Sequence, residues 1–461
     1  MEKLAIQLIR SDHMDKNNPL WHEGIFDFGQ ITPAYTKEQY LLYAGVKKNP
    51  LTLDDVRHIA GEISKFIKSK EWSNAHLDLD HLTQTFPEYT ASQLTTAFYE
   101  GWYLGQYTFS KYKKDKKGTR VELYMEGQDD DCRQTALCRS DAVKATRDLC
   151  NEPPNVLNPD TYDVLLQDIF QDSMVEITVH TEDELQSLEL NGILSVARGS
   201  HYSPKLIQLS YCGSDEAPHI ALVGKGVTFD TGGINAKSGD FADMKMDMGG
   251  SAAVVGAVKL LSGMEARVNV TALIPVVDNV PDARSLLPSE IIQYKNNVSV
   301  QVVNTDAEGR LILADALLFA QELGAVTVVD IATLTGSIGH ALGLKVAGVW
   351  SNNNDLSEKM KAIGSSNGDH VWPMPLVTDY DEWLKNPYAD ISNVGTSPFG
   401  GAITAAVFLN HFINPSTKWL HIDMANTVQS WKAFGYYTSG ASGYGARLLA
   451  DFVLGEIKNE N

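Results

Sequence analysis

Two patterns of hydrophobic and polar positions follow each other along this chain of 461 residues. In the first part, apolar residues recur at helical spacing over 53–67 and again over 94–104. Pro87 and the mostly polar run 73–80 are expected to form turns between these helices. The run 121–125 is expected to be the last strand of this part.

Beyond residue 150, short apolar runs of strand length alternate with helical patterns. Such alternation predicts α/β layers around a mostly parallel sheet. A helix over 133–149 connects the two parts and ends before Pro153, because the position before a proline disfavours helix. The expected strands of the second part are 206–211, 220–223, 268–275, 298–303, 326–331, 346–350 and 419–423.

The chain is predicted to be an α/β protein of two domains, since 461 residues exceed one typical hydrophobic core. Residues 1–130 would form a smaller N-terminal α/β domain, and residues 131–150 a linking helix. Residues 151–461 would form the larger C-terminal domain, in which helices flank a mostly parallel sheet. The loops that carry candidate chemistry all fall in this larger domain.

Composition and charge narrow the function classes. Apolar residues make up 43% and charged residues 21% of the chain, as in ordinary soluble globular proteins. The formal net charge of −20 argues against a general binder of nucleic acid or of anionic membranes. The basic run 111–118 is expected to be a solvated linker or hairpin flank rather than a nucleic-acid contact.

The cysteines and the N-terminus favour a cytoplasmic protein. The apolar run 1–9 is too short for a signal peptide, and no stretch approaches the ~20 uninterrupted apolar residues of a membrane span. The cysteines have no disulfide or zinc spacing, so we expect reduced thiols. They are Cys132, Cys138, Cys150 and Cys212.

The segment 304–310 is the most informative chemical feature. Asp306 and Glu308 lie two residues apart, and Arg310 follows two residues later. If the segment is extended, alternate side chains point the same way and the three would converge on one site. Neighbouring acids repel unless a positive charge lies between them, and a divalent cation is the usual solution.

A second group of charged residues lies in a glycine-rich loop between a buried strand and a helix of small residues over 251–261. In open α/β sheets such loops lie at the carboxyl ends of strands, where ligands bind. A helical pattern over 310–323 also follows Asp306 and Glu308, so the two acid-bearing loops are expected to meet over one sheet edge. The charged residues of the first loop are Lys225, Asp230, Lys237 and Asp247.

Four carboxylates in one place would be balanced by two divalent cations. Two metals roughly 3.5–4 Å apart polarise a scissile carbonyl and lower the pKa of a bridging water toward ~7. Neither group contains His or Cys, so the oxygen ligands suit Mg²⁺ or Mn²⁺, whereas a neutral Lys225 amine would favour zinc or another transition metal. Lys237 and Arg310 would remain positive and could orient a carbonyl, stabilise an oxyanion or hold an anion.

Each residue also has a simpler explanation. Asp306 and Glu308 could cap the following helix, Asp230 could be a turn acid, and Lys225 could belong to a phosphate-binding loop. The meeting of two acidic groups favours the metal site over helix capping. His421, in a strand-like run, is expected to be a core histidine rather than a ligand.

At these residues the sequence resembles the leucyl aminopeptidase (cytosol aminopeptidase) family. Segment 304–310 matches the family signature without a change, and the four charged residues of the first loop fall on its metal and catalytic pattern. The resemblance is dense over about residues 140–461. Further blocks match at 151–155, 332–336, 400–405 and 421–423.

The resemblance implies a metal-dependent aminopeptidase that releases N-terminal residues from peptides, and a homohexamer. Lys237 would act on the substrate carbonyl, and Arg310 would hold a bicarbonate that serves as general base. The two metals would be zinc or manganese, with magnesium or cobalt as alternatives. The tighter metal would be held by Lys225, Asp230, Asp247 and Glu308, and the more exchangeable one by Asp230, Asp306 and Glu308.

The resemblance also assigns a pocket for the first side chain of the substrate. Met244, Thr333 and Gly336 would line it, and Ala425 and Val428 are further candidates. Methionine and small residues predict a preference for medium apolar side chains such as Leu or Met. The loop that carries Met244 departs from the family pattern, because Ser238 replaces the usual proline and the loop is one residue shorter than in many members.

Two other function classes stay open. Some members of the family act as catalytically silent scaffolds or bind DNA, although the complete residue set and the acidic charge count against this. A two-metal phosphoester hydrolase would use a similar oxygen-rich site. Peptides with a free N-terminus are the expected partners, and nucleic acid and membranes are not.

Overall fold

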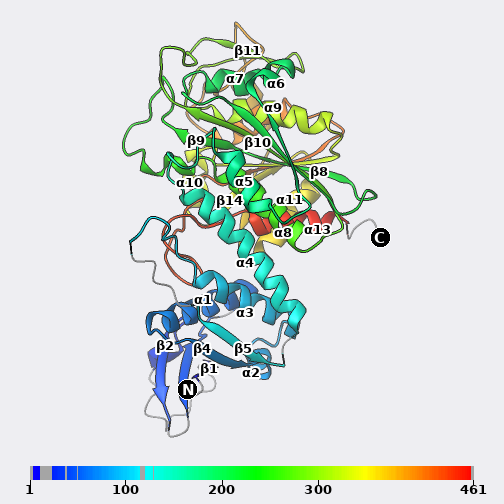
Figure 1. The fold of residues 1–461 in the computed structure, drawn as a ribbon. Helices are drawn as coiled ribbons and strands as arrows, with labels where there is room; N and C mark the ends of the chain where they lie inside the picture. The colour runs from blue at the N-terminus through cyan, green and yellow to red at the C-terminus, as the bar shows by residue number, and fades with distance from the viewer. Residues whose placement is uncertain are drawn as a thin grey trace. The chain divides into compact units, whose positions relative to one another are not determined.

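The computed structural model describes residues 4–10, 23–36, 39–48, 50–114, 120–127 and 129–457 (Figure 1). The chain divides into two compact units. The first comprises Met1–Lys144, Ser366–Gly368 and Lys432–Gly440, and the second comprises Ala145–Ser365, Asp369–Trp431 and Ala441–Asn461. The division falls inside the helix α4 (Asp130–Asn151), which covers the predicted linking helix. The predicted domain boundaries themselves stay a prediction.

The first unit contains a five-stranded sheet with the order β2-β3-β1-β4-β5. Two of its helices, α1 (Leu53–Ser69) and α3 (Ala91–Gly105), pack so closely that a Cβ atom at Gly101 would lie 2.1 Å from the carbonyl oxygen of Arg57. Both helices agree with the predicted apolar spacing. The strands are β1 (Leu4–Ile9), β2 (Ile31–Tyr35), β3 (Tyr40–Gly45), β4 (Asn74–Asp78) and β5 (Glu122–Glu126), and α2 (Leu79–Thr85) follows β4.

The prediction of a turn over 73–80 is wrong, because β4 lies there and pairs in parallel with β1 and β5. Only Ala75 and Leu77 of this strand are buried, and polar residues alternate with them. The strand predicted over 121–125 is confirmed as β5, at the edge of the sheet. The basic run 111–118 lies partly outside the described residues.

The second unit is built on a larger sheet with the order β15-β14-β17-β13-β8-β10-β7-β6, and β9 pairs with β10 beside β8. The central strands β17, β13, β8 and β10 are parallel, and β14 and β15 are parallel to each other. Antiparallel pairs join β14 to β17, β7 to β10 and β6 to β7. The prediction of a mostly parallel sheet is confirmed. The strands are β6 (Glu176–His180), β7 (Lys205–Cys212), β8 (His219–Gly224), β9 (Gly226–Asp230), β10 (Asn269–Asn279), β13 (Thr327–Ala332), β14 (Ala347–Ser351), β15 (Val371–Pro373) and β17 (Lys418–Asp423).

Helices cover both faces of this sheet. The helix α9 (Gly309–Glu322) shares one apolar core with alternate strand residues such as Ala221, Val223 and Val328. Successive strand residues point to opposite faces, and α8 (Gly249–Gly263) contacts the same strands, so it covers the other face. The remaining helices of the unit are α5 (Tyr162–Phe170), α6 (Glu182–Ser187), α7 (Asn191–Ala197), α10 (Gly336–Leu342), α11 (Asn354–Asn367), α12 (Gly401–Asn410) and α13 (Ala446–Ile457).

The run predicted as a strand over 298–303 forms only β12 (Ser299–Gln301) and lies outside the main sheet. It pairs with β11 (Ile291–Gln293) and β16 (Ile391–Ser392) in a separate three-stranded sheet. Within the described ranges, none of the helices has both the length and the apolar character needed to cross a bilayer. The four cysteines are free thiols.

Candidate active site

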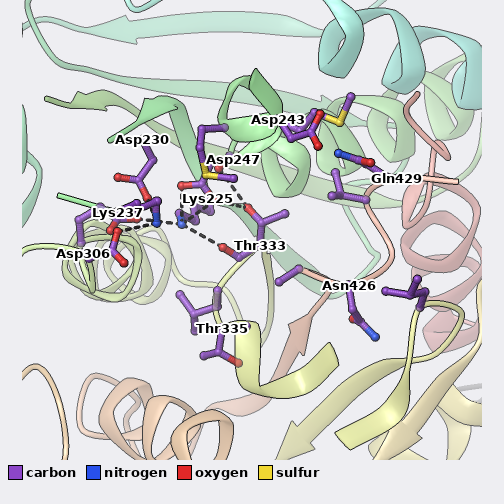
Figure 2. A pocket seen from close by; sticks show the side chains of 18 of the residues that line it. Lys225, Asp230, Lys237, Asp243, Asp247, Asp306, Thr333, Thr335, Asn426 and Gln429 are labelled. Carbon is purple, nitrogen blue, oxygen red and sulfur yellow. Dashed lines mark hydrogen bonds and ion pairs between the residues drawn. The ribbon is translucent and has the colours of Figure 1, made fainter. Parts of the chain in front are cut away.

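Three neighbouring parallel strands end at the same edge of the main sheet. Gly224 at the end of β8 pairs with Ile331 of β13, and Ala332 pairs with Asp423 at the end of β17. The loops that follow these strands surround a cavity of about 520 Å³ (Figure 2). Cavities of this size at the carboxyl ends of strands are typical ligand sites of α/β proteins.

Lys225 lies at the buried end of this cavity, directly after β8, and its side chain is only 3% exposed. Its Nζ lies 2.7 Å from Asp247 Oδ2 and 2.9 Å from Glu308 Oε1. It also donates a hydrogen bond of 2.9 Å to the carbonyl oxygen of Thr333. Burial alone would lower the pKa of Lys225, but the carboxylates outweigh burial and raise it above its ordinary value.

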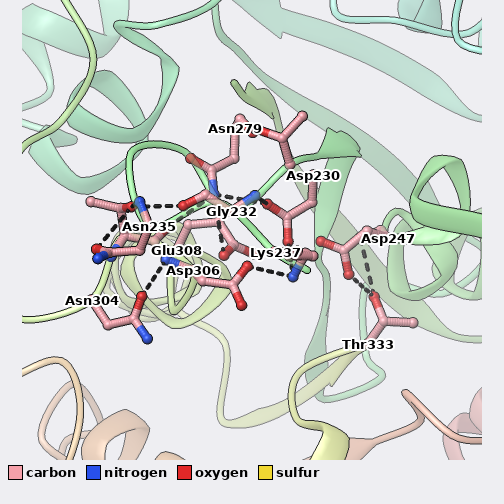
Figure 3. A network of polar contacts seen from close by, with 12 residues as sticks. Asp230, Gly232, Asn235, Lys237, Asp247, Asn279, Asn304, Asp306, Glu308 and Thr333 are labelled. Atoms are coloured by element: carbon pink, nitrogen blue, oxygen red, sulfur yellow. Dashed lines mark hydrogen bonds and ion pairs between the residues drawn. The ribbon is translucent and has the colours of Figure 1, made fainter. Parts of the chain in front are cut away.

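Lys237 approaches the same carboxylates from the glycine-rich loop (Figure 3). Its Nζ lies 2.7 Å from Asp230 Oδ2 and 2.5 Å from Asp306 Oδ1. Its side chain keeps 26% exposure, so the ammonium group remains accessible from the cavity. Burial would lower the pKa of Lys237, and Asp230 and Glu308 raise it above the ordinary value.

The segment 304–310 is a turn followed by the start of α9, so the condition of an extended segment, under which three side chains would converge, does not hold. The side chain of Asn304 causes the turn, because its Oδ1 accepts a 2.9 Å hydrogen bond from the Asp306 backbone N–H. Asp306 and Glu308 nevertheless reach one place. Together with Asp230 they offer oxygen atoms that all lie within 4.8 Å of one another.

Hydrogen bonds join the two acid-bearing loops. Thr305 Oγ1 donates to the carbonyl oxygen of Gly232 over 2.6 Å, and the Asn235 backbone N–H donates to Thr305 Oγ1 over 2.9 Å. Asn279, at the end of β10, donates from Nδ2 to Asp230 Oδ1 over 2.8 Å and to the Thr305 carbonyl oxygen over 3.0 Å. The positions of Asp230 and Asp306 are therefore fixed by neutral side chains that the sequence motifs did not single out.

The carboxylates fit a cation site on two further observations. Burial raises the pKa of Asp247, Asp306 and Glu308 above the ordinary carboxyl value, although Lys225 and Lys237 act to lower it. Asp247 Oδ2 and Asp306 Oδ1 are enclosed, and each faces a lysine nitrogen without a hydrogen bond of good geometry. Four carboxylates share two ammonium groups, so additional positive charge would be stabilised here.

Arg310 lies in the first turn of α9 and does not line the cavity. Arg310 is 7% exposed, and its Nη1 donates to the carbonyl oxygen of Asn393 over 2.8 Å. Burial lowers the pKa of Arg310 to about 10. Its Nε is enclosed without a hydrogen-bond partner among the described residues.

The five residues assigned to the first-side-chain pocket all line the cavity. Gly336 has open space where a Cβ atom would stand, so the absence of a side chain there enlarges the pocket. Thr333 has a second role, because its Oγ1 donates to Asp247 Oδ1 over 2.8 Å and holds that carboxylate in place. Ala425 and Val428, the two further candidates, also line the cavity. With their neighbours in 425–431 they form the wall across the cavity from the carboxylate cluster.

His421 and Asp423 lie in β17, beneath the loops that line the cavity, and do not line it themselves. His421 is fully buried and its Nδ1 lies 2.6 Å from Asp330 Oδ1, as expected of a core histidine. Asp423 accepts hydrogen bonds from the backbone N–H groups of Leu334 and Ala425 and from Thr335 Oγ1 at 2.6 Å. It thereby fixes the loop between β13 and α10, which carries Thr333 and leads to Gly336 at the start of α10.

A buried carboxylate cluster at the carboxyl edge of a mostly parallel sheet is the arrangement expected of a metal-dependent hydrolase with an α/β fold. The family model described as "Cytosol aminopeptidase family, catalytic domain" matches residues 144–450. The chain belongs to the cytosol aminopeptidase family. Membership of this family makes the protein a peptidase of the leucyl aminopeptidase type, which is a metal-dependent aminopeptidase.

Curated relatives and solved structures agree with this family over nearly the whole chain. The probable cytosol aminopeptidase of Persephonella marina is 35% identical over 92% of this chain and 88% of its own length. That of Rickettsia felis is 35% identical over 95% and 90%.

Among solved structures, the bottromycin maturation enzyme BotP in complex with Mn has a TM-score of 0.91 at 25% identity, covering 99% of each chain. The cytosol aminopeptidase of Coxiella burnetii has a TM-score of 0.86 at 24% identity and shares the fold over 99% of this chain and 98% of its own. The predicted fold class is confirmed.

Proposed function

We propose that this protein is a two-metal aminopeptidase that releases N-terminal residues with medium apolar side chains, such as Leu or Met, from peptides. One observation carries this assignment. The oxygen cluster of Asp230, Asp306 and Glu308 lies at one end of a cavity whose other walls include Met244 and the open position at Gly336.

The charged residues would hold two divalent cations. Lys225, Asp230, Asp247 and Glu308 would hold one, and Asp230, Asp306 and Glu308 the other. Zinc or manganese are the expected ions, and magnesium or cobalt would also suit the oxygen donors. Lys225 can act as a ligand only as a neutral amine, so cation binding must displace its proton. When bound, the ions would polarise the scissile carbonyl and acidify a water molecule.

The residues that stay positive would act on the substrate directly. Lys237 is the accessible ammonium group at the carboxylate cluster, where it can donate to the carbonyl oxygen of the scissile bond and to the oxyanion that follows. By the family resemblance, Arg310 would hold a bicarbonate that serves as a general base, and its Nε has no hydrogen-bond partner among the described residues. Met244, Thr333 and Gly336, with Ala425 and Val428, would receive the first side chain.

Location and assembly are inferences supported by the names of the relatives and by the family resemblance. We infer a cytoplasmic protein, supported by the printed name of the relatives, cytosol aminopeptidase. We infer a homohexamer, which size-exclusion chromatography with light scattering would test. An elution mass of one or two subunits would contradict it.

The decisive experiment couples metal analysis to hydrolysis of Leu-p-nitroanilide. We expect the purified protein to lose its activity in a chelator and to recover it with manganese or zinc, at two metal ions per subunit. Activity that survives full metal removal would overturn the proposal. Bis-p-nitrophenyl phosphate and a labelled DNA duplex serve as controls, since preferred phosphoester cleavage or a gel shift at physiological salt would favour the alternative functions.

A further inference from the structure

The cavity extends well beyond the carboxylate cluster. Its volume is about 520 Å³, whereas the four carbons of a leucine side chain fill on the order of 120 Å³ at roughly 30 Å³ for each water-sized group. The substrate backbone takes part of the remainder. The far end is formed by Leu344, segment 425–431 and the short helix η3 (Ala242–Met246), so it can receive the end of a longer side chain.

Asp243 places a negative charge at this far end. It precedes Met244 in η3, is exposed, and lines the cavity (Figure 2). Across the described part of the chain, no Lys, Arg or His nitrogen lies within 4.0 Å of its carboxylate. Lys245, two residues later, instead donates to the carbonyl oxygen of Asn151 over 2.7 Å. The other carboxylates of the cavity all face a lysine, so Asp243 is the acid left for a ligand.

The adjacent wall carries further polar side chains, among them Asn426, Gln429 and Ser430. Asn426 uses its Nδ2 group for the carbonyl oxygens of Gly343 and Val346, the latter at 2.9 Å. Its Oδ1 and the Oγ of Ser430 are enclosed without hydrogen-bond partners among the residues described. The exposed carboxylate of Asp243 is therefore the group of this wall that a ligand can reach. A ligand group with several N–H donors and a positive charge would complement that carboxylate, and a guanidinium group has five such donors.

We propose that Asp243 is a specificity-determining residue that binds the cationic end of an arginine or lysine at the substrate's N-terminus. The inference rests on the proposed function, because it needs the first side chain to enter this cavity. The apolar stem of such a side chain would pass Met244, whose unbranched chain adapts to different shapes. The charged end would stay at the hydrated rim beside Asp243, as long cationic side chains commonly do.

The test compares arginine with citrulline, which has nearly the same shape and no charge. We would measure kcat/KM for the p-nitroanilides of arginine, citrulline and leucine with the manganese-loaded full-length protein. The ratio of kcat/KM for arginine to kcat/KM for citrulline should be roughly 2 to 5, the range that an exposed ion pair supports. Asp243→Asn should lower this ratio by the same factor.

Asp240→Asn is the matched control, because Asp240 is exposed on the same loop and does not line the cavity. Its ratio should equal that of the wild type. A wild-type ratio of one, an unchanged ratio in Asp243→Asn, or an equal fall in Asp240→Asn would each overturn the inference while leucine cleavage still supports the proposed function. If no substrate is cleaved, the proposed function fails and the inference with it.

Discussion

The side chain of Lys225 lies directly against the backbone of Gly309. A Cβ atom at residue 309 would lie 2.6 Å from Lys225 Cε and 2.8 Å from its Nζ, closer than Cβ atoms approach in real structures. Gly309 follows Glu308, whose carboxylate contacts the same lysine. The lack of a side chain at Gly309, in the signature segment, therefore makes room for Lys225, which lies 84 residues earlier in the sequence.

We accordingly predict that Gly309→Ala displaces the Lys225 amine and weakens metal binding by about 10- to 100-fold, as changes beside metal ligands commonly do. The fold should persist, because alanine favours helix at the start of α9. Titration with manganese, read by activity and by calorimetry, would measure the change. Gly455→Ala in α13 is the control, since only the flexible end of Lys359 lies near that position. An unchanged metal affinity in Gly309→Ala would contradict the prediction.

Gly336 gives a second prediction, on the size of the first-side-chain pocket. Because nothing lies within 4 Å of a Cβ atom there, Gly336→Val should fold normally and fill part of the cavity. We expect kcat/KM for Leu- and Met-p-nitroanilide to fall by about tenfold or more relative to Ala-p-nitroanilide, as pocket contacts of one or two methyl groups can achieve. Equal loss for all three substrates would show that Gly336 does not contribute to the pocket.

Much of the fold follows from periodicity in the sequence. The apolar spacing over 53–67 and 94–104 becomes α1 and α3, and the buried runs near 220 and 326 become the central strands β8 and β13. The strand β4 was missed because only two apolar residues, Ala75 and Leu77, alternate with polar ones, and such a short pattern resembles a turn. Its identity depends on pairing with β1 and β5, which no local pattern reveals.

The site was predictable in its charged residues but not in the geometry that joins them. The two acid-bearing loops contact each other as expected, although the segment 304–310 forms a turn and is not extended. Hydrogen bonds from the Asp306 and Ala307 backbone N–H groups to the side chain and the carbonyl oxygen of Asn304 close the turn. Asn279 and Asn393 hold the loops from distant strands, and an isolated asparagine gives no spacing signal.

A third prediction separates the metal ligands from the residues that act on the substrate. Glu308→Ala or Asp306→Ala should lose metal and activity together, because each removes an oxygen from the shared cluster. Lys237→Ala should retain metal and lower kcat by about 10²–10³, the effect of losing one donor to an oxyanion. Arg310→Ala should likewise keep metal and slow turnover. The metal content of each variant, measured by elemental analysis, and its kcat would distinguish the two groups of residues. Full metal content with a normal rate in Glu308→Ala would disprove the ligand assignment.

A fourth prediction concerns the dependence of stability on pH. Asp315 of α9 is almost completely buried, and its Oδ2 accepts a 2.9 Å hydrogen bond from the Ile193 backbone N–H. Its Oδ1 has no partner among the described residues. Burial raises the pKa of Asp315 well above its ordinary value, so the folded state holds the proton more tightly than the unfolded state, in which the pKa is about 3.9.

The sign follows from proton linkage. The contribution of Asp315 to stability is fully present below pH ~4 and is lost by about 1.4 kcal/mol per pH unit as the pH rises toward the folded pKa. Asp315→Asn keeps the acceptor and cannot ionise. The melting temperature of the variant minus that of the wild type should therefore increase from pH 5 to pH 8 in the same metal-free buffer series. A difference that stays constant over this range would show that Asp315 does not carry the proton in the folded state.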